Sequence, residues 1–302
     1  MECGSLTSHT SNQKRLLTME LSAVIITYNA ARHLRACIDA LRSVADEIII
    51  VDSGSTDSTA EIARGFPEVR WYERTFDGYG SQKNYANSLA QGKYILSVDA
   101  DEVLSPELQR AILAEKGQWR ADAYSFLRVA VYCGAFIRAA GWYPDWKVRI
   151  FRRDAARWSD EPVHERLLLP SGTKVIRLQG EMWHYSYASP EENLLRTSKY
   201  ARLAAEMMAK AGQSPNWWRG FAKAGARFTK SLIIKGGWRL GWRGVSIAFL
   251  GAIYYVLREI YLSYAHYRET APNGVSSFHD PSSSPSKSLG MGAADTRAPH
   301  GS

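Results

Sequence analysis

The chain has 302 residues, of which 45% are hydrophobic, and a formal net charge of +8. This size is enough for one large domain or two small ones. The first twenty residues are polar, include Lys14 and Arg15, and contain no long apolar core, which argues against a signal peptide and favours a cytoplasmic location. Cys3, Cys37 and Cys133 share no metal-ligand or C-x-x-C spacing, so we interpret them as reduced thiols.

Two apolar runs near the N-terminus, residues 21–29 and 47–57, each predict a buried strand that ends in polar residues and leads into a helical pattern. Strand, helix, strand, helix is the signature of a parallel sheet with right-handed crossovers. Ligands of such sheets bind beyond the carboxyl ends of the strands, where Thr27 and Asp52 fall. The sequence therefore predicts an α/β fold with a ligand site at this edge.

A third strand is predicted at residues 94–98, and it delivers two carboxylates, Asp99 and Asp101. Residues i and i+2 share one face of a strand, so the two side chains can converge on a hard cation such as Mg²⁺ or Mn²⁺. Such ions usually arrive with a phosphate ligand. A solvated acidic turn is the alternative for an isolated D-x-D. The position of Thr27, Asp52 and Asp99 at the ends of three strands favours a site.

These motifs carry a family resemblance. Residues 22–29, 51–57 and 99–101 together resemble family 2 glycosyltransferases of the GT-A fold. A narrower likeness is to the lipopolysaccharide core glycosyltransferases that resemble beta-1,4-glucosyltransferases. It is carried by residues 78–84, 141–145, 149–153, 163–165 and 184–187. The resemblance extends over about residues 21–264. It implies a Rossmann-like, mostly parallel sheet flanked by helices. It also implies metal-dependent inverting transfer of a hexose from a UDP-sugar, with glucose favoured, to a lipopolysaccharide-core or other membrane-linked glycan.

The resemblance also implies roles for donor-site residues. Thr27, Tyr28 and Asn29 match the first-strand loop that contacts the nucleoside. Asp52 matches the carboxylate that accepts a hydrogen bond from the base, usually uracil. Lys83 follows two glycines and is expected to neutralise a phosphate or a neighbouring carboxylate.

The same resemblance assigns the metal site. Asp101 matches the direct ligand of Mg²⁺ or Mn²⁺, while Asp99 contacts the ribose or supports the metal through water. His184 is the candidate for a late histidine that joins the metal shell, although a lone histidine is more often a structural side chain. The cation would stabilise charge on the departing nucleoside diphosphate.

Inverting transfer needs a carboxylate that deprotonates the acceptor hydroxyl. Glu165 stands where the family places this base, at the end of an acidic cluster. Asp160 and Glu161 are the alternatives, and His164 occupies a position where many relatives carry a second acid. The assignment of Glu165 therefore rests on its position.

Eight of the ten tryptophans lie from Trp142 onward, in the part of the chain that is expected to hold the acceptor. Residues 141–146 resemble an acceptor-facing loop, so we expect Trp142, Tyr143 and Asp145 to contact the acceptor. Arg149 is expected to meet acceptor phosphates, and a solvated charge beside a strand is the alternative. Core packing is the alternative for most of the tryptophans.

Positive charge gathers in the C-terminal third, where eleven Lys and Arg residues and one acid, Glu206, lie within residues 196–245. Four cations recur at helical spacing with apolar residues between them: Arg219, Lys223, Arg227 and Lys230. Residues 245–257 then form a run of thirteen without a charge, whereas spanning a bilayer takes about 20 residues. We predict an amphipathic helical appendage on an anionic membrane surface, with packing on the catalytic domain as the alternative.

These features divide the chain into four expected segments: an N-terminal extension (1–19), a catalytic domain (20–215), membrane-interface helices (216–268) and a disordered tail (269–302). The protein is expected to lie on the inner face of the cytoplasmic membrane. Nucleic acid is not an expected partner, because no recognition motif accompanies the basic charge.

Three other functions would each account for part of the sequence. A phosphohydrolase of the haloacid-dehalogenase type also carries D-x-D-x-V, matched by residues 99–103, but that motif belongs on the first strand of its sheet and no downstream partner motif follows. An NAD-dependent oxidoreductase would need G-x-G-x-x-G after a strand, and the chain has none. A non-catalytic membrane adaptor accounts for the basic C-terminal region but gives the strand-end carboxylates no role.

Overall fold

The computed structural model describes residues 19–159 and 165–270. Its first half alternates strands and helices as the apolar runs predict. The elements are β1 (Leu21–Thr27), α2 (Ala31–Leu41), β2 (Glu47–Asp52), α3 (Thr59–Arg64), β3 (Val69–Glu73), α4 (Tyr79–Leu89) and β4 (Tyr94–Asp99). β2 is buried along its whole length and β1 along nearly all of it, because helices cover both faces of this part of the sheet.

Parallel pairing brings the predicted site residues to one edge of the sheet. β1 pairs with β2 on one side and with β4 on the other. In this register Thr27 lies opposite Asp52, and Ile26 lies opposite Asp99. The expected convergence of Thr27, Asp52 and Asp99 at the carboxyl ends of three strands is therefore confirmed.

The second half of the sheet is mixed. Its elements are β5 (Glu102–Leu104), α5 (Pro106–Glu115), β6 (Ala123–Tyr132), β7 (Ala135–Ile137), β8 (Trp146–Arg152) and β11 (Val175–Tyr187), while β9 (Arg157–Trp158) and β10 (Leu167–Leu168) form a separate pair. The strand order is β3-β2-β1-β4-β8-β6-β11-β5, with β7 beside β6. The predicted α/β fold is confirmed. The four strands β3-β2-β1-β4 are all parallel, whereas β8 runs antiparallel to both of its neighbours, and β11 pairs parallel with β6 but antiparallel with β5.

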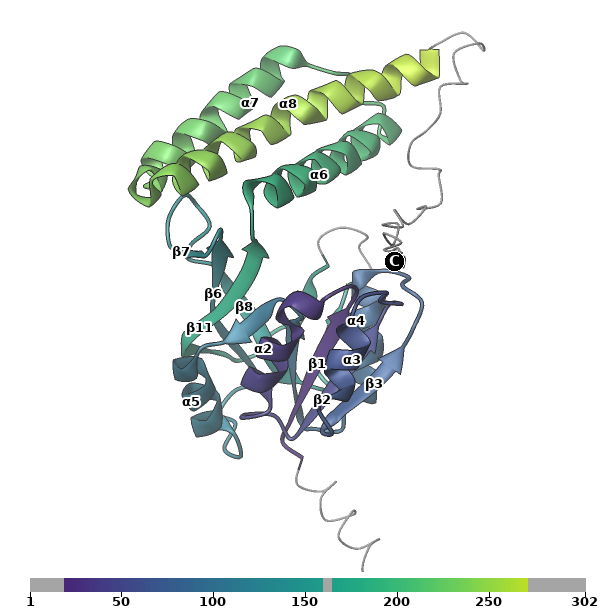
Figure 1. The fold of residues 1–302 in the computed structure, drawn as a ribbon, viewed down its shortest axis with the longest axis vertical. Coiled ribbons are helices and arrows are strands. Elements are labelled where there is room, and N and C mark those ends of the chain that lie inside the picture. Colours follow the sequence, from purple (N-terminus) through teal and green to yellow (C-terminus); the bar gives the residue numbers. More distant parts are fainter. Residues whose placement is uncertain (1–18, 160–164, 271–302) are drawn as a thin grey trace, which may run out of the picture.

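Three long helices follow the sheet and lie together at the other end of the molecule (Figure 1). They are α6 (Pro190–Lys210), α7 (Trp217–Thr229) and α8 (Trp242–Thr270), with the short helices η1 (Lys230–Ile234) and η2 (Gly237–Leu240) between the last two. Ser189 is the N-cap of α6, and its hydroxyl accepts a hydrogen bond from the backbone N–H of Glu192. α8 packs between α6 and α7, so the helical unit includes α6 as well as the predicted segment 216–268.

α8 is longer than the thirteen-residue apolar run indicated. Arg258 and Glu259 end that run in the sequence, yet the helix continues through both. Their side chains are buried and form an ion pair at 2.5 Å. Within the described residues, one helix is long and apolar enough to cross a membrane by length and composition, the segment Trp242–Arg268. A third of its most apolar window (33%) is buried inside the protein, consistent with its packing on α6 and α7.

Candidate active site

Lys83 lies between two carboxylates at the edge of the sheet. It projects from α4, and its Nζ is 3.1 Å from Asp99 Oδ1 and 3.0 Å from Glu165 Oε1. Only 5% of its side chain is exposed, and its ammonium lies 4.5 Å from the centroid of the Trp158 ring. The structure thus brings the predicted base, Glu165, next to the first aspartate of the D-x-D motif. The alternatives Asp160 and Glu161, and also His164, lie outside the described residues.

A second cation, Arg149, contacts the other oxygen of Asp99. Its guanidinium is 3.0 Å from Asp99 Oδ2 and 2.6 Å from Glu102 Oε1. Arg149 is 4% exposed, and Glu102 is fully buried. We expected Arg149 to contact the acceptor. On the antiparallel strand β8, however, its side chain is buried against the two carboxylates. Arg149 instead holds Asp99 and Glu102 together.

Sequence reasoning missed Glu102. Its Oε2 accepts a hydrogen bond from the backbone N–H of Asp99 at 3.0 Å, which fixes the turn between the two aspartates. A third acid directly after the D-x-D motif and before the apolar pair Val103-Leu104 was the available signal. A charged residue in such an apolar setting is buried only with partners.

The electrostatics distinguish the partly exposed Asp99 from the fully buried Glu102. Burial alone would raise the pKa of Asp99, but the ammonium of Lys83 and the guanidinium of Arg149 lower it well below its usual range. For Glu102 burial has the larger effect and raises the pKa, with Arg149 opposing and the charge of Asp99 adding to it. The pKa of Arg149 is raised by both carboxylates, although burial opposes this. Asp99 therefore presents a fixed negative charge at this edge.

The predicted metal ligands also meet. His184 Nε2 on β11 lies 3.3 Å from Asp101 Oδ2, and both side chains are partly exposed. The hydroxyl of Ser186 is 3.0 Å from His184 Nδ1 and fixes the orientation of the ring. Among residues 19–159 and 165–270, no group of three His, Cys, Asp or Glu side chains could hold a metal. One carboxylate and one imidazole fit a divalent cation that takes its other ligands from phosphate oxygens and water.

Asp52 is more enclosed than a base-contacting carboxylate is expected to be. It is 2% exposed. Its Oδ1 accepts hydrogen bonds from the hydroxyls of Thr27 at 2.7 Å and Ser55 at 2.5 Å, and its Oδ2 accepts from the N–H groups of Gly54 at 2.9 Å and Ser55 at 2.7 Å. A carboxylate has about four acceptor positions, and these four bonds use them all. In this geometry Asp52 shapes the loop after β2.

The loop after β1 carries the other two predicted nucleoside contacts. Asn29 has a φ of 48°, and its side-chain oxygen accepts a hydrogen bond from the N–H of Thr56 at 2.8 Å, which ties this loop to the one after β2. Tyr28 is 65% exposed. Of the predicted donor residues in this loop, Tyr28 is therefore the one whose aromatic face is open to a ligand.

Two of the expected acceptor residues line a pocket beside the proposed metal ligands Asp101 and His184. The pocket has a volume of about 350 Å³, and its walls include Trp142, Asp145 and His184. Tyr143 is half-buried and is not among the lining residues. The structure thus places an aromatic ring and a carboxylate from the 141–145 loop next to the predicted metal ligand.

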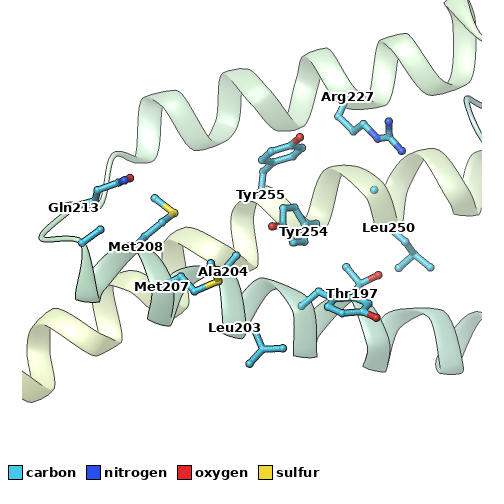
Figure 2. Close-up of a pocket in the computed structure, with 13 residues that line it drawn as sticks. Thr197, Leu203, Ala204, Met207, Met208, Gln213, Arg227, Leu250, Tyr254 and Tyr255 are labelled. Atoms are coloured by element: carbon cyan, nitrogen blue, oxygen red, sulfur yellow. The ribbon is translucent and has the colours of Figure 1, made fainter. Parts of the chain in front are cut away.

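A larger cavity lies elsewhere. It has a volume of about 770 Å³ and is formed by α6, α7, α8 and the turn after α6 (Figure 2). Its walls are mainly apolar, with Leu203, Met207, Met208 and Leu250, and Arg227 is its one charged lining residue. No carboxylate lines it, so the transfer chemistry belongs at the edge of the sheet and not in this groove.

Comparison with known proteins agrees with this geometry. The family model for glycosyl transferase family 2 matches residues 22–171. The lipopolysaccharide core biosynthesis glycosyltransferase LpsC of Rhizobium meliloti is 29% identical over 267 residues, which cover 84% of this chain and 96% of LpsC. An uncharacterized glycosyltransferase of Rickettsia bellii is 30% identical over 223 residues, 67% of this chain and 75% of the relative.

Among solved structures, residues 1–349 of Staphylococcus aureus TarS in complex with UDP are partly similar in fold to this chain. The TM-score is 0.43 at 16% identity, covering 84% of this chain and 93% of that one. On the family match, the sequence relatives and the arrangement of the strand-end residues, the chain belongs to glycosyltransferase family 2.

Proposed function

We propose that this glycosyltransferase is a metal-dependent inverting hexosyltransferase that transfers a hexose, with glucose favoured, from a UDP-sugar to a lipopolysaccharide-core or other membrane-linked glycan. The observation that carries the proposal is the meeting of Asp101 and His184 at 3.3 Å beside the Asp99–Lys83–Glu165 cluster. The relative LpsC, named for lipopolysaccharide core biosynthesis, supports the acceptor class.

Each residue has a distinct task in this proposal. Asp101 and His184 would hold Mg²⁺ or Mn²⁺, and a bound cation stabilises the negative charge that develops on the departing diphosphate. Lys83 positions Glu165 through their 3.0 Å contact, and Glu165 accepts the proton of the attacking acceptor hydroxyl. Tyr28 and the tied loops after β1 and β2 provide the surface for the nucleoside.

A donor screen tests the proposal. UDP-, GDP- and dTDP-hexoses are incubated with the full chain in Mn²⁺, in Mg²⁺ and in EDTA, and released nucleotide is measured. We expect hydrolysis of the UDP-sugar with metal, none in EDTA, and loss of the metal-dependent activity in Asp101→Ala. A β-linked product from an α-linked donor shows inversion. Failure of UDP to stabilise the protein thermally in Mn²⁺, or equal rates with all three nucleotides, contradicts the proposal.

We further propose that the helical unit lies on the inner face of the cytoplasmic membrane. Large apolar side chains are strongly exposed along α7 to α8: Trp218, Phe221, Ile233, Ile234, Trp238 and Phe249. Aromatic rings beside Lys and Arg are typical of helices at a lipid surface. Removing one such cation weakens attraction to anionic lipid by about 1 kcal/mol, roughly fivefold.

Vesicle sedimentation tests this location. The full chain is expected to bind vesicles containing anionic lipid at low salt and to bind neutral vesicles less. Lys223→Glu on α7 should weaken this binding at least fivefold. The matched substitution Lys174→Glu, at an exposed position before β11, should leave it unchanged. If the full chain ignores anionic vesicles at low salt, the membrane proposal fails.

A further inference from the structure

The pocket beside His184 is rich in cations. Its walls come from β6, β8, β11, the 141–145 loop and the first turns of α6. Three cationic side chains line it, Arg128, Lys147 and Arg196, against a single carboxylate, Asp145. A cluster of this kind in a concave site indicates an anionic ligand, because positive charges held together repel one another until an anion joins them.

Asp145 is shared between two of the three cations. Its Oδ2 accepts a hydrogen bond from Nε of Arg128 at 2.9 Å, and its Oδ1 lies 3.0 Å from Nζ of Lys147. Glu102 lies 3.5 Å from Arg128 but is paired more closely, at 2.6 Å, with Arg149. One carboxylate in the lining therefore neutralises one of the charges that Arg128 and Lys147 carry.

Arg196 is the third cation and comes from a different part of the fold. No ion pair joins Arg196 to a carboxylate among the described residues, although Glu192, one turn earlier on α6, interacts with it electrostatically. The guanidinium of Arg196 lies 5.0 Å from the centroid of the Tyr187 ring and also forms a hydrogen bond with that side chain. Contact with an aromatic ring holds a guanidinium in one orientation, and because a guanidinium has five N–H donors, those that do not bond to Tyr187 remain available for an oxyanion. Tyr187 and Trp142 also line the pocket and offer apolar surface to a sugar ring.

We propose that this pocket is an acceptor subsite that binds a phosphate or carboxylate group carried by the acceptor, with Arg196 as its specificity-determining residue. The inference rests on the proposed function, since it places the acceptor beside the donor. His184 forms one wall of the pocket, whereas Asp101 is not among the lining residues. The pocket therefore adjoins the expected metal site without including its carboxylate, and we assign the anion that it binds to the acceptor.

Binding of inorganic phosphate gives the first test. The full chain is saturated with UDP and Mn²⁺ and then titrated with phosphate, with binding followed by tryptophan fluorescence and calorimetry. Charge-assisted hydrogen bonds are worth enough that Arg196→Gln should weaken phosphate binding at least tenfold. The control is Lys199→Gln, which removes the same charge from an exposed position three residues along α6 and outside the pocket. It should bind phosphate as the parent does.

Acceptor kinetics give the second test. Two glycoside acceptors that differ only in one phosphate ester are compared, with UDP-hexose as donor. Arg196→Gln should raise the KM of the phosphorylated acceptor at least tenfold with kcat changed less than threefold, while the KM of the neutral acceptor stays constant. Equal losses on both acceptors contradict the subsite, because they indicate a general structural role for Arg196.

The remaining outcomes separate the subsite from the proposed function. If UDP displaces phosphate competitively, or if Arg196→Gln weakens UDP as much as phosphate, the anion site belongs to the donor and the subsite is refuted. If Arg196→Gln and Lys199→Gln behave alike, the subsite is also refuted. Absence of UDP binding by the parent chain in Mn²⁺ instead overturns the proposed function, and phosphate binding that depends on Arg196 in that case still shows an anion site.

Discussion

Replacing Glu165 by glutamine should separate the chemical step from donor binding. The glutamine side chain keeps the shape of glutamate, and its carbonyl oxygen can still accept the hydrogen bond that Lys83 makes to Oε1 at 3.0 Å. It cannot accept the proton of the acceptor hydroxyl. Loss of a general base costs about 10²–10⁴ in rate, or roughly 3–5 kcal/mol in the activation free energy. Donor affinity should change less than threefold, because Lys83 keeps its 3.1 Å contact with Asp99.

Steady-state kinetics with UDP-hexose, combined with calorimetry for UDP, measure both quantities. The matched control is Glu181→Gln. Glu181 is an acid on β11 with similar exposure, 21% against 19%, and it pairs with Arg138 outside the cluster. Glu181→Gln should retain parental kcat. Turnover of Glu165→Gln within threefold of the parent would refute the base assignment and move it into the acidic segment before Glu165. Loss of UDP binding would instead assign Glu165 to the donor site.

Three further results are expected. Asp101→Ala and His184→Ala should each abolish the gain in UDP affinity that Mn²⁺ provides, and unchanged calorimetric affinity in Mn²⁺ would remove the residue from the metal site. Arg149→Met removes the cation shared by the buried Glu102 and the partly exposed Asp99 and should lower the free energy of unfolding by about 3–5 kcal/mol in urea. The exposed Arg152→Met should change it by less than about 0.5 kcal/mol. Burial alone would raise the pKa of Asp46, but Lys116 and two backbone N–H groups lower it below its ordinary value of 3.8. The stabilisation by Asp46 is therefore complete above that pH and is lost as the pH falls through the folded-state pKa. Asp46→Asn should reduce the loss of unfolding free energy at acid pH, and an unchanged loss would contradict this assignment.

The part of the site that could be predicted from sequence is the part that local patterns determine. Apolar runs that end in Thr27, Asp52 and Asp99 identify three strands, and parallel strands place their carboxyl ends at one edge. The D-x-D spacing predicts that Asp101 faces the site. Each of these inferences needs only a segment of fewer than ten residues and the rule that buried parallel strands are continuous apolar runs.

The side-chain network needed information that no local pattern contains. Arg149 reaches Asp99 because β8 inserts antiparallel between β4 and β6, opposing Ile150 to Leu96. The sequence distance between these strands is large, and nothing in residues 146–152 indicates which neighbour β8 chooses. The sequence therefore led us to expect Arg149 at the acceptor phosphates, with a solvated charge beside a strand as the alternative. For the same reason the enclosure of Asp52 by Ser55 and Gly54 was missed, since it depends on the path of a loop.

A series of cation–carboxylate contacts connects the proposed base with the proposed acceptor pocket. They run in sequence from Glu165 through Lys83, Asp99, Arg149, Glu102 and Arg128 to Asp145. One end of this series is the proposed base, and the other end lies in the wall of the acceptor pocket. Buried ion pairs contribute little net stability, because desolvation offsets their attraction, but each fixes the geometry of its partners. A series of such pairs across α4, β4, β5, β6 and β8 therefore contributes more to the relative placement of the proposed donor, base and acceptor groups than to stability.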